Sequence, residues 1–260
     1  MRSLPAPIRD LELRDRLGEL LGEALHDQGR AAPLYLIRSF GRLAEARGPV
    51  GVSPEDLIRA AEDALREAGR PASAKEVIHE LLGSGLLEQT GDGAGSLRVA
   101  PGKHLLAELS AVVVRTDAYC RALEALYRRP LHPAGEMERA LEAAACLFNE
   151  GLFFEVHEVL EALWLKLEGQ SRLLLQGLIQ IAVGFHHLEN RNINGALSLL
   201  REGREKVNAY GPDRFGLRLD RFLEQADACR RSIESLGREA FDRFDRQMIP
   251  RMHFQNRGEA

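Results

Sequence analysis

Residues 148–196 read FNEGLFFEVHEVLEALWLKLEGQSRLLLQGLIQIAVGFHHLENRNINGA, and this stretch decides how the C-terminal half of the chain folds. It is the most apolar part of the sequence, yet polar side chains recur within it. Those that stand out are His157, Glu161, Arg172, Gln176, Gln180 and His187. A polar group costs free energy to bury unless it finds a partner. These residues are therefore expected to form either a structural network or a binding site.

Glycines and capping residues divide the C-terminal half into a series of predicted helices. The expected helices span residues 136–149, 152–167, 171–189, 195–210 and 219–235. Ser171 and Asn194 are the expected caps of the third and fourth helices. The last twenty or so residues are expected to be loosely ordered. Successive helices joined by short turns predict an all-α bundle of helical hairpins.

Helical geometry predicts which side chains of residues 152–167 face the protein interior. At about 100° per residue, His157 and Trp164 lie just beside an apolar stripe, and Glu161 lies about 40° further round. Glu161 has apolar neighbours on both sides, so we expect it to be the most buried acid of this segment. Glu158 falls at the edge of the same face, and Glu155 is expected on the outside.

The next helix, residues 171–189, is apolar around most of its circumference, which predicts a central position in the bundle. Its polar residues fall within about 80° of one another: Arg172, Gln176, Gln180 and His187. We therefore expect one polar seam between the two helices. Within it, Arg172 would pair with a glutamate, and the glutamines and histidines would form hydrogen bonds. Trp164 is expected to be a core residue that caps this cluster.

Three interpretations of the polar cluster are open. It can be a buried network that fixes how the helices pair. It can line a pocket for a small polar or anionic ligand. It can also hold a metal ion through His157, Glu161 and His187, since the first two are spaced like the ligands of an HExxH zinc motif. Glu158 would then be the general base, whereas the fixed charge of Arg172 argues against a metal.

The N-terminal half is predicted to be helical with one β-hairpin. Helices are expected over residues 10–28, 33–46, 53–68 and 73–83, then strands at 86–90 and 96–100, and a long helix over 103–128. Ser53 and Ser73 stand where a hydroxyl group can cap a helix start. Helix, turn, helix and then a hairpin is the element order of a winged helix.

The boundary between the two halves is expected near residue 130. Residues 128–135 read RRPLHPAG, and two prolines with a glycine are typical of a linker. At 260 residues the chain is long enough for two small domains. We therefore expect a winged-helix-like helical domain over residues 1–129 and a helical bundle over residues 130–260.

Residues 73–83 would be the DNA-reading helix of a winged helix. Their polar side chains are Lys75, Glu76, His79 and Glu80. A DNA reader directs several cations and amides at phosphates and base edges, and two acids oppose that. We therefore expect a protein partner or self-association, with nucleic acid as the less favoured alternative.

The bulk composition narrows the class of protein further. A net charge of −4 argues against nucleic-acid binding driven by overall charge. The sequence contains neither a signal-peptide pattern nor an apolar run of ~18 residues, so we expect a cytoplasmic protein without a membrane partner. The three cysteines are widely spaced and are expected to be buried thiols. No cofactor is expected.

Three ordered motifs follow one another from residue 148 to residue 200. They are Phe148-Asn149-Glu150-Gly151 with Phe154-Glu155-x-His157-Glu158-x-Leu160-Glu161-x-x-Trp164, then Arg172-x-x-x-Gln176-Gly177-Leu178-Ile179-Gln180-x-Ala182-Val183, and finally His187, Asn192 and Asn194-Gly195-Ala196-x-x-Leu199-Leu200. In these motifs the chain resembles a bacterial and archaeal helical family, the domain of unknown function numbered 309. The resemblance implies an all-helical fold and brings no established activity.

Together these features favour a binding, regulatory or scaffold protein over an enzyme. The sequence lacks a nucleophile–base motif such as GxSxG. Two alternatives stay open. One is a metal-dependent hydrolase that uses His157, Glu161 and His187, and the other is a DNA-binding regulator that acts through the winged-helix-like half.

Overall fold

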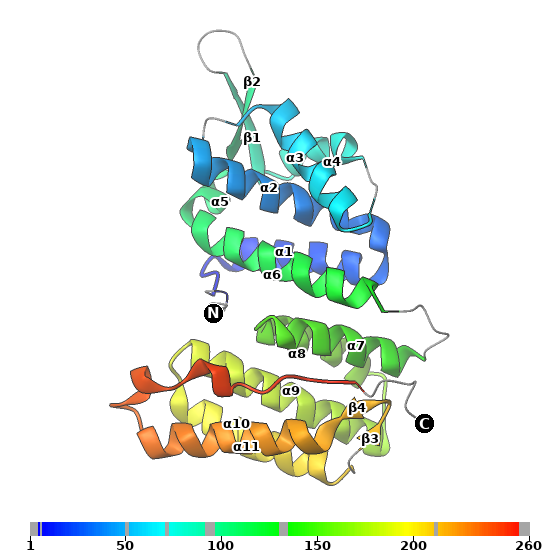
Figure 1. Cartoon of the computed structure of the whole chain (residues 1–260), viewed down its shortest axis with the longest axis vertical. Coiled ribbons are helices and arrows are strands. Elements are labelled where there is room, and N and C mark those ends of the chain that lie inside the picture. The colour runs from blue at the N-terminus through cyan, green and yellow to red at the C-terminus, as the bar shows by residue number, and fades with distance from the viewer. Residues whose placement is uncertain are drawn as a thin grey trace. The chain divides into compact units, whose positions relative to one another are not determined.

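The computed structural model describes residues 5, 7–49, 52–70, 73–91, 97–129, 135–210 and 213–254. The chain divides into two compact units, Met1–Tyr127 and Arg128–Ala260. The predicted mainly helical fold class with a small β-hairpin is confirmed, because helices make up most of both units and one longer hairpin lies in the first (Figure 1). No helix in the described part of the chain is long and apolar enough to cross a lipid bilayer.

The N-terminal unit consists of helices followed by a hairpin and two further helices. Its elements are α1 (Leu11–His26), the 3₁₀ helix η1 (Gln28–Ala31), α2 (Ala32–Arg47), α3 (Pro54–Glu67), α4 (Ala74–Gly83), β1 (Leu87–Gly91), β2 (Leu97–Pro101), α5 (Lys103–Ala107) and α6 (Leu109–Tyr127). Helix α2 lies at the centre of this unit and packs against α3, α4 and α6. Its side chains Leu34, Tyr35 and Phe40 are fully buried.

Two α-helices of this unit, α1 and α3, start at side-chain caps. Asp10 caps α1 by accepting the backbone N–H of Leu13, and Ser53 caps α3 by accepting that of Asp56. Ser73 occupies the cap position of α4, but its side chain makes no capping bond. The single helix expected over residues 103–128 is wrong, because Glu108 leaves the helical conformation and separates α5 from α6.

The hairpin pairs β1 with β2 in antiparallel register, with Leu87 opposite Pro101 and Gly91 opposite Leu97. A single antiparallel bridge joins Val52, which precedes α3, to Val99 of β2. The predicted turn at residues 92–95 and most of the predicted linker, residues 130–134, lie outside the described residues.

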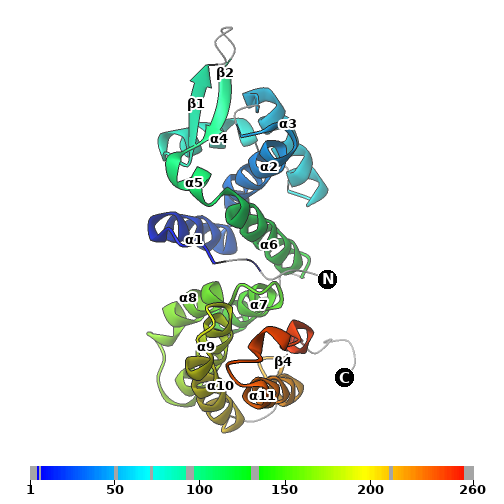
Figure 2. The same ribbon diagram turned by 90° about the vertical axis from the view of Figure 1, so that its left-hand side faces the viewer.

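The C-terminal unit is a set of antiparallel helical hairpins (Figure 2). Its elements are α7 (Glu136–Asn149), α8 (Phe153–Trp164), α9 (Gly169–Glu189), α10 (Ile193–Asn208), β3 (Asp213–Arg214), β4 (Leu217–Arg218), α11 (Leu219–Leu236) and the 3₁₀ helices η2 (Phe241–Arg243) and η3 (Arg246–Met248). Helix α9 packs against α8 and α10, which confirms its predicted central position.

Aromatic side chains fill the core of this unit. The ring of Phe148 on α7 meets Phe153, Phe185 and Phe222 edge to face, at centroid distances of 5.0, 5.6 and 5.4 Å. Such pairs add to the free energy gained by burying apolar area. Because the four rings come from four different helices, this cluster fixes α7, α8, α9 and α11 around one point.

Three predictions about this unit are wrong. Glu168, not Ser171, holds the cap position of α9, since the helix starts earlier at Gly169. Asn192, not Asn194, caps α10 by accepting the backbone N–H of Gly195. The third concerns the C-terminal segment, because its described residues 241–254 pack on the unit, with Phe241 and Met252 buried. Long-range contacts, which local patterns do not reveal, order that segment.

The three cysteines are free, buried thiols, as the sequence predicts. Cys120 lies on α6, Cys146 on α7 and Cys229 on α11. Burial raises the pKa of Cys120 and of Cys229 to about 12. Both thiols are therefore protonated at neutral pH and unreactive.

Candidate functional site

The predicted polar cluster on α8 and α9 separates into four groups. The first is on α8, where His157 lies 3.7 Å from Glu158 and 3.5 Å from Glu161, measured between ring nitrogen and carboxylate oxygen. The rings of His157 and Phe154 are 5.9 Å apart. His157 is half-buried and both carboxylates are largely exposed. This group is a partly solvated histidine with two acids on its own helix.

The second group lies where α8 ends and α9 begins. The guanidinium carbon of Arg172 sits 3.9 Å from the ring centroid of Trp164. Arg172 Nη1 also donates to the carbonyl oxygen of Leu167, at 3.1 Å. A carbonyl just beyond a helix end lacks an intrahelical donor, so Arg172 satisfies it from the next helix.

This arrangement corrects the expected pairing of Arg172 with a glutamate. Among the described residues, Arg172 has a stacking and a backbone partner but no ion pair. Its position in the first turn of α9 brings it beside the end of α8 instead of beside the acids. Trp164 is half-buried, and its Nε1 atom is buried without a hydrogen-bond partner in the described part of the chain.

The third group joins α9 to α10. Gln180 Nε2 donates to Glu202 Oε2 at 3.1 Å, and Lys206 Nζ donates to Gln180 Oε1 at 2.8 Å. Glu202 also accepts a hydrogen bond from Ser198 at 2.9 Å. Gln176 is half-buried and makes no hydrogen bond with another described residue. The seam of α9 therefore meets α10 at this point, whereas the sequence predicted that it faces α8.

The fourth group lies at the end of α9. His187 Nδ1 is 3.2 Å from Asn192 Nδ2, in the turn that leads to α10. Burial lowers the pKa of His187, and the charge of neighbouring His186 lowers it further. His187 is thus favoured in its neutral form, as a member of a helix-terminal turn.

Two acids of α8 differ from the prediction in how far they are buried. Glu161, the expected buried acid, has a side chain that is 47% exposed. Its apolar flank is itself at the surface, since Leu165 is 66% exposed. Glu155, expected outside, is only 4% exposed. It lies in the first turn of α8, and burial at a helix end depends on nearby chain segments more than on helical angle.

The described residues do not assemble the three metal candidates. Among them, no group of three or more His, Cys, Asp or Glu side chains is arranged to hold a metal ion. His157 and Glu161 are neighbours on α8, but His187 belongs to the separate turn that contains Asn192.

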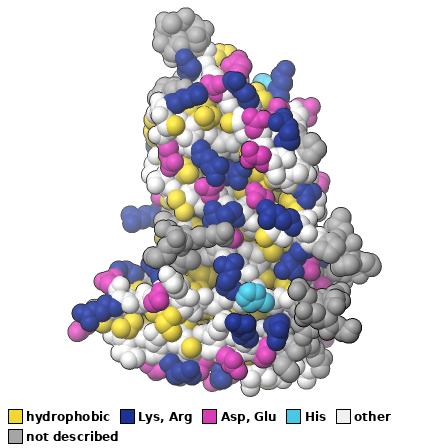
Figure 3. Space-filling view, in the orientation of Figure 1, with side chains coloured by type: hydrophobic (Ala, Val, Ile, Leu, Met, Phe, Trp, Pro, Cys, Tyr) yellow, Lys and Arg dark blue, Asp and Glu magenta, His cyan; other side chains and the backbone are white. Residues whose placement is uncertain are grey.

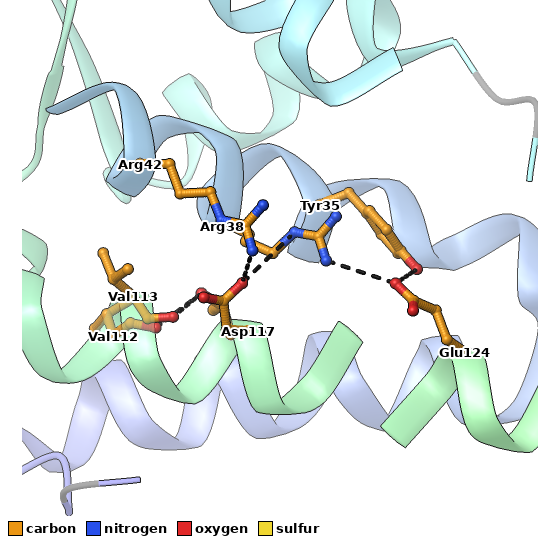
Figure 4. A network of polar contacts seen from close by, with 8 residues as sticks. Tyr35, Arg38, Arg42, Val112, Val113, Asp117 and Glu124 are labelled. Atoms are coloured by element: carbon orange, nitrogen blue, oxygen red, sulfur yellow. Dashed lines mark hydrogen bonds and ion pairs between the residues drawn. The ribbon is translucent and has the colours of Figure 1, made fainter. Parts of the chain in front are cut away.

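A second polar network, which the sequence analysis missed, joins α2 to α6 in the N-terminal unit (Figure 4). Arg42 Nη2 lies 2.7 Å from Asp117 Oδ1. Arg38 approaches the same oxygen at 3.9 Å and Glu124 Oε1 at 3.6 Å. The Tyr35 hydroxyl donates to Glu124 at 3.3 Å. Helix α2 thus contributes two arginines and α6 two carboxylates along their line of contact.

Arg38 is the buried centre of this network. It is 7% exposed, its guanidinium lies 4.5 Å from the Tyr35 ring centroid, and its Nε has no hydrogen-bond partner among the described residues. Burial raises the pKa of Tyr35, as does the nearby Glu124. A lone arginine inside the apolar run Leu34–Phe40 was the available sequence signal.

The exposed face of α4 carries mixed charge with an acidic excess. Ala74, Ile78 and Leu81 are the buried residues of this helix. Its exposed polar side chains are Lys75, Glu76, His79 and Glu80. On the adjoining strand β1, Glu88 and Gln89 are also exposed. All four residues predicted to form the outer face of this helix therefore do so.

Comparison with known proteins adds a family match for part of the chain. No curated protein sequence matches this one. The sequence profile of the family described as Domain of unknown function (DUF309) matches residues 141–199. This range runs from α7 through α8 and α9 into α10. The helical hairpins of the C-terminal unit thus carry the match to the Domain of unknown function (DUF309) family that their motifs predict.

Proposed function

We propose that this protein is a binding and scaffold protein whose N-terminal unit docks a protein partner through α4 and β1. The observation that carries the proposal is the exposed charge on α4, where Glu76 and Glu80 stand beside a single lysine. Phosphate groups of nucleic acid repel such a face. A protein surface with a basic segment complements it.

The element order supports a winged-helix-like unit. Helices α2, α3 and α4 are followed by the β1–β2 hairpin, and the bridge between Val52 and Val99 adds a third extended segment beside it. In such a unit α4 is the helix that reads DNA or meets a partner. The acids on α4 and Glu88 on β1 favour the second role.

The polar groups of α8, α9 and α10 support a scaffold role for the C-terminal unit. Gln180 cross-links α9 to α10, and Arg172 satisfies the end of α8. These bonds use the polar side chains to hold helices in register, as a structural network does. A metal-dependent hydrolase lacks a comparable supporting observation, because the candidate ligands belong to separate groups.

The test of the docking role is charge reversal on α4. The full-length protein would be treated in cells with an amine-reactive cross-linker, since exposed Lys75 provides an attachment point on the same face. We expect cross-links from Lys75 to a basic segment of another protein. The double variant Glu76→Lys/Glu80→Lys should lose them. A control variant, Glu19→Lys/Glu45→Lys, changes two exposed acids of α1 and α2 and should keep them.

DNA binding by α4 would contradict the proposed protein-docking role. Fluorescence anisotropy with labelled duplex DNA at low salt should show no binding by the wild-type protein. Binding that is weakened by Lys75→Ala would contradict protein docking and identify the N-terminal unit as a DNA reader. Cross-links that survive charge reversal would also contradict it.

A further inference from the structure

A pocket of about 430 Å³ opens in the C-terminal unit between α11 and the C-terminal segment, residues 247–253. Its lining includes Arg221, Gln225 and Ala228 from α11, and Met248, Arg251 and His253 from the C-terminal segment. None of its lining residues is acidic. The volume lies in the range of small-molecule sites. The pocket is outside the family match, which ends at residue 199.

Helical spacing places the α11 side chains together. Arg221, Gln225 and Ala228 are four and three residues apart, so they share one face of α11. The other face carries buried Phe222 and Cys229 and packs into the core. Rigid packing of the apolar face therefore holds the pocket face of α11 in place.

The opposite wall is an extended segment anchored at three points. Asn149 donates from Nδ2 to the carbonyl oxygen of Met252 at 2.9 Å, and its Oδ1 accepts the backbone N–H of Met252 at 2.8 Å. Arg218 N donates to the carbonyl oxygen of His253, also at 2.8 Å. An isolated bridge joins Leu217 to Phe254.

Side chains alternate in direction along this extended segment, and this determines which of them face outward. Met252 is buried at 2% exposure, whereas Arg251 and His253 on either side of it are exposed. Successive side chains of an extended chain point in opposite directions. The buried methionine therefore turns the arginine and the histidine away from the core, toward α11.

The basic groups around the pocket have no counter-ion within the described part of the chain. No ion pair there involves Arg218, Arg221 or Arg251. Further along α11, Arg230 does pair with Asp227, 3.0 Å away. Figure 3 shows Lys and Arg side chains gathered beside a histidine over the C-terminal segment of this unit.

Two further features of the pocket indicate which ligand it prefers. Burial lowers the pKa of His253, and the charges of Arg221, Arg251 and Arg218 lower it further, so the ring is favoured neutral and can donate one N–H. Gln225 Oε1 is buried without a hydrogen-bond partner among the described residues. A ligand hydroxyl group would supply the donor that this oxygen lacks.

We propose that this pocket binds a small organic phosphate. Arg221 and Arg251 would hold the phosphate group, because guanidinium groups bind such oxyanions through charge-assisted, often paired hydrogen bonds. Gln225 would accept from a hydroxyl group of the organic part, which would lie against Ala228 and Met248. The concave shape and the apolar wall favour a small molecule over a nucleic-acid backbone. This proposal is independent of the docking role of α4.

Isothermal titration calorimetry of the full-length protein tests this site. The probes are inorganic phosphate, ribose 5-phosphate, glucose 6-phosphate, adenosine monophosphate, unphosphorylated ribose and a single-stranded oligonucleotide. We expect at least one organic phosphate to bind more tightly than inorganic phosphate, and ribose not to bind. Arg221→Gln and Arg251→Gln should each weaken binding about tenfold or more. Gln225→Leu should weaken binding of the organic phosphate but not binding of inorganic phosphate.

The control is Arg201→Gln, which changes an exposed arginine of α10 and should leave every affinity unchanged. Absence of binding by all phosphate probes at millimolar concentration would overturn the proposal. So would binding that neither Arg221→Gln nor Arg251→Gln weakens. An oligonucleotide that binds more tightly than the mononucleotide, with affinity rising with its length, would replace the small-molecule site with a nucleic-acid surface.

Discussion

Gly177 on α9 and Gly203 on α10 face each other where these two helices are in contact. A Cβ atom built on Gly203 would lie 2.6 Å from the carbonyl oxygen of Gly177, and one built on Gly177 would lie 2.8 Å from that of Gly203. Neither backbone atom can rotate away as a flexible side chain would. The absence of two side chains therefore sets how closely the central helix packs against its neighbour.

Gly203→Ala is expected to destabilise the C-terminal unit by about 1–3 kcal/mol, because the new methyl group forces the helices apart. Chemical denaturation followed by circular dichroism measures this loss. Gly18→Ala in α1 is the control, since no described atom outside its chain neighbours and its own helix backbone lies within 4 Å of its Cβ position. That change should stabilise its helix by about 0.5–1 kcal/mol. Equal effects of the two variants would contradict close packing at Gly203.

The stack of Arg172 on Trp164 can be followed by fluorescence, because the chain has a single tryptophan. Arg172→Ala should expose the indole ring and shift its emission to longer wavelength. The stability loss is expected to be about 1 kcal/mol. Arg204→Ala, at an exposed position of α10, is the control and should leave the spectrum unchanged. An unchanged spectrum in Arg172→Ala would show that the stack is not formed in solution.

Gln180 and Gln176 provide a matched pair on α9. Gln180→Leu removes hydrogen bonds to Glu202 and Lys206, and we expect it to lower the free energy of unfolding by about 1 kcal/mol. Gln176 makes no hydrogen bond with a described residue, so Gln176→Leu should leave stability within about 0.5 kcal/mol of wild type. Urea denaturation compares the two. A larger loss for Gln176→Leu would argue against the cross-link between α9 and α10.

The α2–α6 network predicts unequal roles for its two arginines. Arg38→Ala leaves two carboxylates of α6 without their buried partner and should cost about 2–3 kcal/mol. Arg42 is 58% exposed, so Arg42→Ala should cost at most about 1 kcal/mol despite its shorter ion pair. Denaturant midpoints of the two variants test this order. Similar losses of stability in the two variants would show that ion-pair distance, not burial, controls how much each arginine contributes to stability.

The ion pair between His104 and Asp10 makes stability depend on pH. His104 Nδ1 lies 2.6 Å from Asp10 Oδ2, and this hydrogen bond raises the pKa of His104 and lowers that of Asp10. The stability that His104 contributes is fully present below its ordinary pKa of 6.5 and is lost as pH rises through the raised pKa. The stability that Asp10 contributes is fully present above its ordinary pKa of 3.8 and is lost as pH falls through the lowered pKa.

The two contributions overlap between pH 3.8 and pH 6.5, where the pair stabilises the N-terminal unit most. Between pH 5.5 and pH 9, the wild-type protein should therefore lose stability relative to a His104→Gln variant. Paired denaturation curves at the two pH values measure the difference. A constant difference between the proteins would mean that the pair does not contribute in solution.

Much of the fold follows from local patterns in the sequence. The apolar periodicity of residues 152–167 and 171–189 predicts α8 and α9 with slightly different bounds, and the largely apolar circumference of α9 predicts its central position. Asp10 and Ser53 cap helices because a side-chain oxygen at the first turn satisfies a free backbone N–H. These outcomes depend on residues a few positions apart, which a sequence specifies directly.

The polar cluster was less predictable, because a helical angle gives a direction and not a partner. Gln180 lies on the predicted face of α9, but the helix opposite that point is α10. Glu161 lies on the predicted side of α8, but that side is open to solvent beside exposed Leu165. The buried Arg38 network was not predicted at all, since its carboxylates lie on α6, far along the chain.

The sequence by itself determined most of the helices, the β1–β2 hairpin and the residues that match the family. Tertiary structure alone decided which polar groups meet, and it divided one expected cluster into separate groups. It also ordered the C-terminal segment, where Asn149 binds Met252 and turns Arg251 and His253 toward α11. The physical reason is how far apart in the sequence the interacting residues lie. Helix formation depends on neighbouring residues, whereas a pocket requires the packing of segments that are distant in the chain.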